Sequence, residues 1–248
     1  MEKPLRFEWT PIIAVDDLDL CSRLKPSAIL AHFQDIATEH AALLNIGAKR
    51  MGELKCFWVL TKVAVEIVDN PNWCTKVKII TYPRSPSSIE ATRDYYMYGD
   101  NGRLLAKGSS KWCVLDYAAK KIRRISDVFS YPLDNYYNED AIQSGCTRLV
   151  MPTDGDKLGR LVVKTTDLDR NRHMNNAKYG DTALNFEDIE FVMTHDIKSF
   201  QLNYLSELAY GEEIDIMRAV CGDKRIYYGT KADGKPSFIM ETLWKKRK

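Results

Sequence analysis

Two stretches of the chain alternate apolar and polar residues, break at a turn, and then alternate again. Residues 63–79 read VAVEIVDNPNWCTKVKI, and residues 200–216, at an offset of 137, read FQLNYLSELAYGEEIDI. The turn contains Trp73 in the first stretch and Tyr210 in the second. A period of two is typical of strands that bury one face. We therefore predict a strand on either side of each turn.

A second pair of stretches carries the signal of a β-hairpin. Residues 95–112 (YYMYGDNGRLLAKGSSKW) and 227–244 (YYGTKADGKPSFIMETLW) align at an offset of 132. Their Tyr-Tyr pairs, their turn glycines Gly102 and Gly234, and their tryptophans coincide. An Asn-Gly or Asp-Gly turn between aromatic and β-branched runs favours two strands joined by a tight turn. Each stretch is therefore predicted to form a hairpin.

A third match lies further upstream, where DLDLCSRLKP (17–26) aligns with DLDRNRHMNN (167–176) at an offset of 150. A helix is expected after each segment. In the first half Pro26 suits the first helical position and Gly47 suits the C′ position. Apolar residues between them recur at three- and four-residue steps and should form the buried stripe: Ile29, Phe33, Ile36, Ala37 and Leu44.

In the second half Asn175 or Asn176 is expected to cap the helix. The residues that should face inward there are Tyr179, Ala183 and Phe186. One long helix followed by several antiparallel strands, twice over, implies an α+β fold in which a sheet wraps around each helix. The three offsets shrink steadily along the chain, as expected for two diverged copies with loop deletions.

The domain boundaries follow from this repeat. We place the first unit at residues 1–130 and the second at residues 159–248. The stretch between them, 131–158, lacks periodicity and is expected to be a linker.

Composition narrows the class of protein. The formal charge of the 248 residues is +2, which does not favour nucleic acid as the main partner. The six cysteines show no CxxC pair and are expected to be reduced thiols, with no metal site. The first ten residues lack the apolar region of a signal peptide, and no run reaches the roughly 18 apolar residues of a spanning helix. We expect a soluble cytoplasmic protein without a membrane span.

The two copies differ most in the loop before the helix. Both keep Asp-Leu-Asp, at 17–19 and 167–169, so this acidic frame is expected to shape the turn and cap backbone amides. After the frame, Asn171 and His173 of the second copy replace a cysteine and an arginine of the first. A loop required only by the fold would need similar residues in both halves. Asn171 and His173 are therefore candidates for function.

The spacing of these residues suits acyl chemistry. In an extended loop Asp169, Asn171 and His173 alternate onto one side, just before a helix N-terminus that favours negative charge. An amide donor and an imidazole there can hold an acyl oxyanion, while the carboxylate fixes the imidazole tautomer or shares a water. No GxSxG elbow and no glycine-rich phosphate loop occurs in the chain. Water activated by a carboxylate or an imidazole is therefore the expected nucleophile.

A histidine–asparagine loop that opens a helix, with a sheet wrapped around it, resembles the hotdog fold. The doubled version resembles the acyl-acyl carrier protein thioesterases of plants and bacteria. The segments that carry this resemblance include AILAHFQDIATEHAALLNIG, FWVLTKVAVEIVDNPNW, TTDLDRNRHMNNAKYGDTALN and FQLNYLSELAYGEEI. The resemblance implies a tandem hotdog that hydrolyses the thioester between a fatty acyl chain and acyl carrier protein, without cofactor or metal.

The resemblance also implies catalytic residues. Glu207, in LNYLSEL, would activate the attacking water together with His173. Asn171 would orient the substrate carbonyl or the water, and Asp169 would hold Asn171 and His173 in place. Plant members of the family commonly have a cysteine directly after this glutamate, whereas Leu208 stands here, so a cysteine nucleophile is disfavoured.

The position of Glu207 raises a question about the strand. Strict alternation along FQLNYLSEL puts Phe200, Leu202 and Tyr204 on one face and Glu207 on the other. Glu207 therefore reaches the site only if the strand bulges or if its face turns towards His173. The alternative is a solvated glutamate at the end of a strand.

The acyl chain and the carrier need their own surfaces. The first copy is expected to hold the acyl chain, with Phe33, Phe57, Trp58 and Trp73 as lining residues or, alternatively, as plain core. The carrier is acidic, so basic residues near 120–124 or at the C-terminus are candidates for docking it.

Two other functions fit the same resemblance, namely an acyl-coenzyme A thioesterase and a hotdog protein that binds acyl thioesters without cleaving them. A hotdog dehydratase is a third option. The sequence leaves the preferred chain length open, and both a monomer and a homodimer remain open.

Overall fold

A computed structural model of the chain describes residues 5–71, 73–130, 136–137 and 139–247. The chain divides into two compact units. Unit 1 comprises Met1–Ala14 and Ala31–Cys146, and unit 2 comprises Val15–Leu30 and Thr147–Lys248.

This division differs from the predicted boundaries in two places. Residues 15–30, expected in the first unit, belong to unit 2, because their side chains bind groups of that unit, as described below. The expected linker 131–158 is split between the units: Ile142 and Cys146 pack against Ala64, whereas a strand of unit 2 begins at Asp156. Residues 131–135 and 138 of that linker lie outside the described residues.

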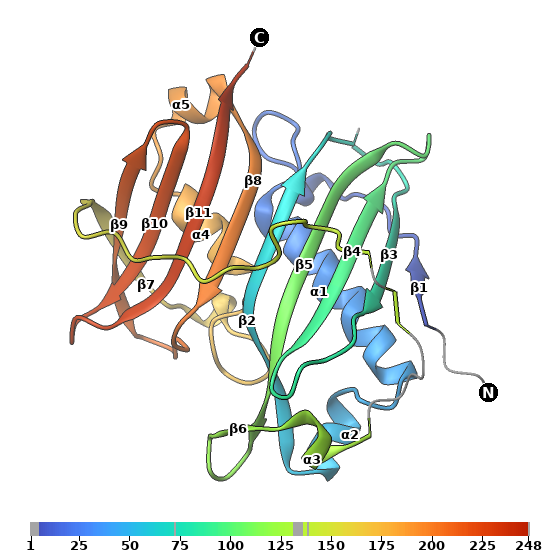
Figure 1. Ribbon diagram of the computed structural model, residues 1–248. Coiled ribbons are helices and arrows are strands. Elements are labelled where there is room, and N and C mark those ends of the chain that lie inside the picture. The colour runs from blue at the N-terminus through green and yellow to red at the C-terminus, as the bar shows by residue number, and fades with distance from the viewer. Residues whose placement is uncertain (1–4, 72, 131–135, 138, 248) are drawn as a thin grey trace. The chain divides into compact units, whose positions relative to one another are not determined.

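Unit 1 contains an antiparallel sheet with the strand order β1-β3-β4-β5-β2, and β6 pairs with β5. Figure 1 shows these strands with helix α1 lying along one face of the sheet. The strands are β1 (Phe7–Trp9), β2 (Cys56–Ile67), β3 (Lys78–Pro83), β4 (Ala91–Tyr98), β5 (Leu104–Asp116) and β6 (Ile122–Arg123). The helices are α1 (Pro26–Leu43), whose first residues belong to unit 2, α2 (Ala48–Glu53) and α3 (Ile125–Val128).

Unit 2 repeats this arrangement, with the strand order β7-β9-β10-β11-β8. Its strands are β7 (Asp156–Val162), β8 (His195–Tyr204), β9 (Glu213–Cys221), β10 (Lys224–Lys231) and β11 (Pro236–Lys246). Its helices are α4 (Lys178–Leu184) and α5 (Ile189–Thr194), and two 3-10 turns, η1 (Val15–Asp17) and η2 (Thr165–Asp167), open the two acidic loops. Equivalent strands thus follow the same order in both units, which confirms the predicted α+β repeat.

The two predicted hairpins form β4–β5 and β10–β11. Gly102 and Gly234 occupy the matching turn position with φ of 75° and 80°, a conformation that L side chains rarely adopt. The indole N–H groups of Trp112 and Trp244 each donate, over 2.8 Å, to the hydroxyl of the residue two positions earlier. The repeat inferred from the sequence therefore extends to the side-chain hydrogen bonds.

Helix α1 begins at Pro26, as predicted, and all five residues of its expected apolar stripe are buried. Phe33 stacks on Tyr95 of β4 with ring centroids 4.4 Å apart. The helix fits closely because Gly108 of β5 has no side chain at this point, where a Cβ atom would lie 2.6 Å from the Phe33 ring.

The end of α1 differs from the prediction. Asn45, rather than Gly47, takes the left-handed conformation, with φ of 58°. The amides of Asn45 and Ile46 donate to carbonyls of the last helical turn, which satisfies groups that a helix end leaves free. Gly47 instead allows close packing, since a Cβ atom there would lie 2.9 Å from Cα of Ala42.

The helix of unit 2, α4, is shorter than predicted, with seven residues. No side chain caps it, although Asn175 Oδ1 accepts the amide of Ala177 one residue before the helix, at 2.9 Å. Tyr179 and Ala183 are buried as expected, and Phe186 is half-buried. After the helix ends, Glu187 turns inward, where two arginines and a tyrosine bind its carboxylate.

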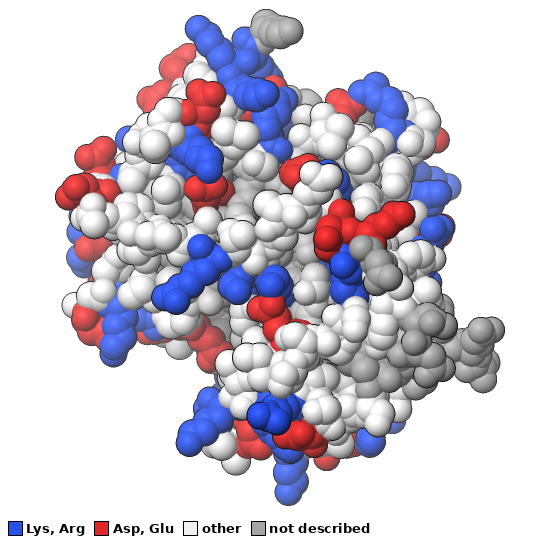
Figure 2. Space-filling view, in the orientation of Figure 1, with Lys and Arg blue, Asp and Glu red and all other residues white. Residues whose placement is uncertain are grey.

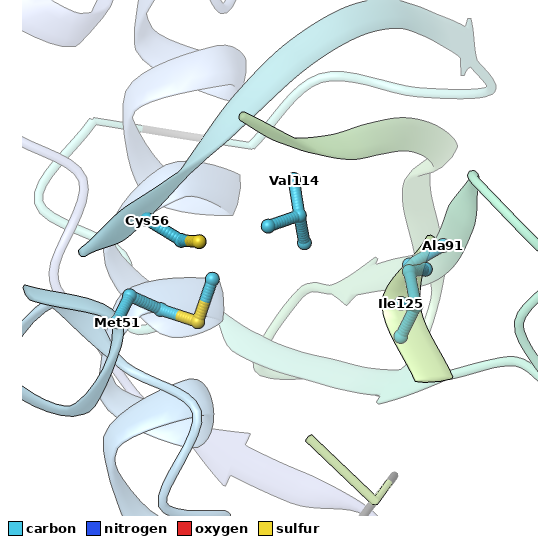
Figure 3. Close-up of a cluster of buried hydrophobic side chains, with 5 residues drawn as sticks. All are labelled: Met51, Cys56, Ala91, Val114 and Ile125. Carbon is cyan, nitrogen blue, oxygen red and sulfur yellow. The ribbon is translucent and has the colours of Figure 1, made fainter. Parts of the chain in front are cut away.

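A buried cluster closes one end of unit 1 between β2, β5 and the short helices. Figure 3 shows its members, Met51, Cys56, Ala91, Val114 and Ile125. Among the helices of the described residues, none is long and apolar enough to cross a lipid bilayer.

Candidate functional site

The two acidic loops share one backbone structure. The amide of Asp19 donates to the carbonyl of Arg23 over 2.8 Å, and the amide of Asp169 donates to the carbonyl of His173 over the same distance. The residue before each of these carbonyls has a positive φ, 60° in the first loop and 65° in the second. The loops are therefore equivalent in conformation as well as in sequence.

The aspartate of each frame caps its own loop. Asp169 Oδ1 accepts the backbone amides of Asn171 at 2.7 Å and His173 at 3.3 Å. Asp19 Oδ1 accepts the two matching amides at 2.8 and 2.9 Å. The expectation that the acidic frame shapes the turn and caps amides is confirmed, since both copies make the same bonds.

The side chains that follow the frame have diverged. The Arg23 guanidinium, with its side chain 10% exposed, binds Asp19 Oδ2 at 2.7 Å and Asp196 Oδ1 at 3.0 Å. It also donates to the backbone carbonyls of Val192, at 3.0 Å, and His195. The arginine of the first loop is thus an anchor within unit 2, with its donors satisfied by oxygen atoms of the protein.

His173, at the same position of the second loop, is paired with Glu207. The distance between His173 Nε2 and Glu207 Oε2 is 3.3 Å, and the two side chains are 36% and 56% exposed. The backbone fixes this approach, because Met174 donates its amide to the carbonyl of Leu208 over 2.8 Å and His173 forms a β-bridge with Ala209. An imidazole and a carboxylate in contact at an accessible position can take up and release a proton.

Glu207 reaches this position because the strand alternation is interrupted. Strand β8 ends at Tyr204, and the amides of Leu205 and Ser206 both donate to the carbonyl of Ser237, over 2.9 and 3.0 Å. Leu205 and Ser206 therefore both lie opposite Ser237, as in a β-bulge, and the side chains that follow point to the other face of the sheet. The bulge that Glu207 needs in order to reach His173 is thus present.

Asn171 has the fewest side-chain contacts of the expected site residues. Its side chain is exposed, and within the part of the chain that is described it makes no hydrogen bond to protein. The structure therefore brings Asp169, His173 and Glu207 into one bonded group and leaves the Asn171 amide open to a bound molecule.

The contribution of the helix N-terminus is smaller than predicted. Helix α4 has only seven residues, so its dipole is short. The amides that lead into it are already bonded, Ala177 to the Asn175 side chain and Lys178 to the Asn175 carbonyl. Side chains rather than the helix end must therefore supply the polar groups of this site.

Sequence reasoning missed the surroundings of the pair. Tyr179 was expected only as an inward-facing residue, yet burial and then the negative charges of Glu207, Glu212 and Asp169 raise its pKa well above the ordinary value. Its phenol therefore stays protonated at neutral pH. Its ring packs edge-on against Tyr204 with centroids 5.3 Å apart. Only the three-dimensional contact of α4 with β8 reveals this.

The aromatic side chains expected to line an acyl tunnel lie in different surroundings. Trp73 was a candidate for lining an acyl tunnel, but it is 66% exposed at the turn between β2 and β3, so this assignment is wrong. Phe33 is buried against Tyr95, and Phe57 contacts Tyr117. Among the described residues there is no group of three or more histidine, cysteine or acidic side chains placed to hold a metal ion.

Comparison with known proteins now identifies the family. Residues 4–133 match the family described as "Acyl-ACP thioesterase N-terminal domain", and residues 151–246 match "Acyl-ACP thioesterase C-terminal domain". The chain belongs to the acyl-ACP thioesterase family. The predicted family and its tandem hotdog fold are thereby confirmed.

Plant relatives share about a quarter of the sequence. The chain is 25% identical to oleoyl-acyl carrier protein thioesterase 2 of Arabidopsis thaliana over 73% of its own length and 54% of the relative's. It is 26% identical to the acyl-[acyl-carrier-protein] hydrolase FATB2 of Cuphea viscosissima over 77% of its own length and 50% of the relative's. The chain thus spans about half the length of the curated relatives it matches.

Solved structures share the fold over nearly the whole chain. The 12:0-ACP thioesterase of Umbellularia californica superimposes with a TM-score of 0.88 at 19% identity and covers 98% of both chains. An acyl-ACP thioesterase of Bacteroides thetaiotaomicron gives a TM-score of 0.86 at 19% identity, over 97% of this chain and 98% of the other.

Proposed function

We propose that this member of the acyl-ACP thioesterase family hydrolyses fatty acyl-acyl carrier protein thioesters to a free fatty acid and the carrier thiol. The observation that carries the proposal is the 3.3 Å contact between His173 and Glu207 on an accessible loop. The equivalent positions of the first copy hold Arg23 and Asn70, so only one copy contains an acid–base pair. Relatives named as hydrolases of the same thioester support this reading.

In the proposed reaction, water attacks the thioester carbonyl while the pair of His173 and Glu207 removes its proton. A carbon–oxygen bond forms, the carbon–sulfur bond then breaks, and the proton passes to the departing thiolate. Leu208, next to Glu207, has no nucleophilic atom and is fully buried, so no covalent intermediate is included. The reaction needs neither metal nor cofactor.

Asn171 and Asp169 have supporting roles in this proposal. The exposed Asn171 amide donates a hydrogen bond to the carbonyl oxygen as negative charge develops on it. Asp169 holds the loop that carries both Asn171 and His173 through their backbone amides. Because Asp19 makes the same bonds in the first copy, Asp169 acts on the geometry of the site and does not itself exchange a proton.

The carrier is acidic, so we propose that basic side chains dock it. In the segment 120–124, Lys120 Nζ lies 5.0 Å from the centre of the Phe57 ring. Arg123 Nη1 lies 3.7 Å from Asp116 Oδ2. Within the described residues, the exposed side chains of Lys121 and Arg124 form no ion pair and are the better candidates. On the face seen in Figure 2, basic and acidic residues are interspersed.

We further propose that the protein acts in the cytoplasm. All six cysteines are free thiols, and two of them, Cys74 and Cys221, are exposed. Exposed thiols remain reduced in a reducing compartment such as the cytosol.

Parallel assays with one acyl chain on acyl carrier protein and on coenzyme A test the proposal. We expect free thiol to be released faster from acyl carrier protein than from coenzyme A. The Glu207→Gln variant is the negative control and should release no thiol. Equal rates on both substrates would favour an acyl-coenzyme A hydrolase. Tight binding of the acyl carrier without thiol release would identify a binding protein instead. A panel of chain lengths then defines the preferred substrate.

A further inference from the structure

The segment that carries Glu207 is held by an ion pair that is separate from the contact between His173 and Glu207. Lys231, at the end of β10, donates from Nζ to the backbone carbonyl of Glu207 over 2.8 Å. The same ammonium group binds Glu212 Oε1 at 2.9 Å, and Glu212 Oε2 accepts the amide of Ala209 at 2.6 Å. Lys231 and Glu212 thus bond the backbone on both sides of Leu208.

We infer that Lys231 and Glu212 are positioning residues for Glu207, an inference that rests on the proposed function. Their contacts leave the Glu207 carboxylate free, because Lys231 binds the carbonyl oxygen of that residue and not its side chain. With the Met174 amide bound to Leu208, three consecutive residues, 207–209, are fixed through their backbones. A carboxylate on such a segment stays at a constant, short distance from the His173 imidazole during turnover.

Both positioning residues come from firmly placed parts of unit 2. Lys231 pairs with Ile214 in the ladder between β10 and β9, and its side chain is only 20% exposed. Burial raises the pKa of Glu212, but the Ala209 amide and the Lys231 ammonium outweigh this and leave the pKa below its ordinary value. Glu212 is therefore ionised at neutral pH, and the ion pair with Lys231 is intact.

The first copy lacks this arrangement. At the offsets that align the two halves, Thr75 stands in place of Glu212 and Gly99 in place of Lys231. The ion pair is thus confined to the copy that also contains His173 and Glu207. A feature required only by the hotdog fold would be expected in both copies, so its presence in one favours a role at the site.

The test compares Lys231→Met and Glu212→Gln with the intact protein in acyl-ACP hydrolysis. Misplacing a catalytic group by about 1 Å costs up to roughly 100-fold in rate, so we expect kcat to fall by about 10- to 100-fold. KM should change little, because neither side chain is proposed to touch the substrate. Lys231→Arg retains a cationic donor and should recover most of the activity. Lys224→Met is the matched control, since it removes an exposed pair with Glu241 at the other end of β10.

A double-mutant cycle separates positioning from general destabilisation. In a Glu207→Gln background, Lys231→Met should have little further effect on kcat, because its effect passes through Glu207. An equal loss in both backgrounds, or wild-type kcat in folded Lys231→Met and Glu212→Gln, would overturn the inference. If Glu207→Gln itself hydrolyses normally, the proposed function of the site fails instead. The two failures are therefore distinguishable.

Discussion

Arg23 and His173 occupy the same position in two loops with the same backbone hydrogen bonds, yet their side chains have different surroundings. The Arg23 side chain is 10% exposed and binds two carboxylates, whereas the His173 side chain is 36% exposed and faces one carboxylate, Glu207. One loop has become an anchor and the other has kept groups that can exchange a proton.

Arg23→Ala should lower stability and leave the chemistry nearly unchanged. The substitution leaves Asp19 and Asp196 without their shared cation, and loss of one partner of a largely buried pair costs about 3 kcal/mol. Chemical denaturation measures this loss. Lys25→Ala, which removes an exposed pair with Asp16, is the control and should change stability little. A large fall in kcat of folded Arg23→Ala would contradict the assignment of Arg23 as an anchor.

His173→Ala should reduce kcat by roughly 10²- to 10⁴-fold, the usual effect of losing a positioned acid–base group. Steady-state hydrolysis of an acyl-ACP substrate measures the change, with circular dichroism to verify the fold. Normal turnover by the folded variant would exclude His173 from the reaction.

Asn171→Ala should lower kcat by about 10²- to 10³-fold if its amide stabilises the oxyanion. Stability should hardly change, because the side chain is exposed and Asp169 binds only the backbone amide of this residue. The comparison of kcat with melting temperature is therefore the informative measurement. A variant that loses stability but keeps kcat would assign Asn171 to the loop structure alone.

Glu187→Gln should remove a pH-dependent contribution to stability. Burial raises the pKa of Glu187, but hydrogen bonds from Tyr227, Arg218 and Arg225 outweigh this and lower it below the ordinary 4.5. Its stabilising contribution is therefore complete above that ordinary value and is lost as the pH falls through the lowered pKa.

The melting temperature of the wild type should thus fall more steeply than that of Glu187→Gln between about pH 5 and pH 3. The variant should also be less stable at neutral pH, because two arginines lose their carboxylate. Glu213→Gln, which affects an exposed pair with Arg160, serves as the control. Parallel curves for wild type and Glu187→Gln would refute the prediction.

Gly108→Ala should destabilise unit 1 by about 1–3 kcal/mol through overpacking. The new methyl group would lie 2.6 Å from the Phe33 ring and 3.1 Å from the carbonyl oxygen of Ala64, so the stack on Tyr95 must shift. Gly52→Ala, in α2, is the matched control, because nothing lies within 4 Å of its added Cβ. Thermal unfolding of the two variants measures the difference, and equal stability would show that Phe33 can move freely.

Local patterns were sufficient for the hairpins and for the acidic loops. Gly102 and Gly234 mark turns that only a glycine enters readily, and alternation marks the flanking strands, so neighbouring residues determine these elements. The start of α1 at Pro26 was predictable for the same reason. Its end was not, because the choice between Asn45 and Gly47 depends on the close approach of Gly47 to Ala42.

The sequence by itself determined the two copies, their strands and the candidate residues Asn171 and His173, because these depend on periodicity and on comparison of one half with the other. Only the tertiary structure decided that Glu207 meets His173, that Arg23 belongs to unit 2, and that Lys231 and Glu212 hold the segment of Glu207. These contacts join residues from separate strands and loops. Their positions depend on a bulge and on strand pairing, which no local pattern specifies.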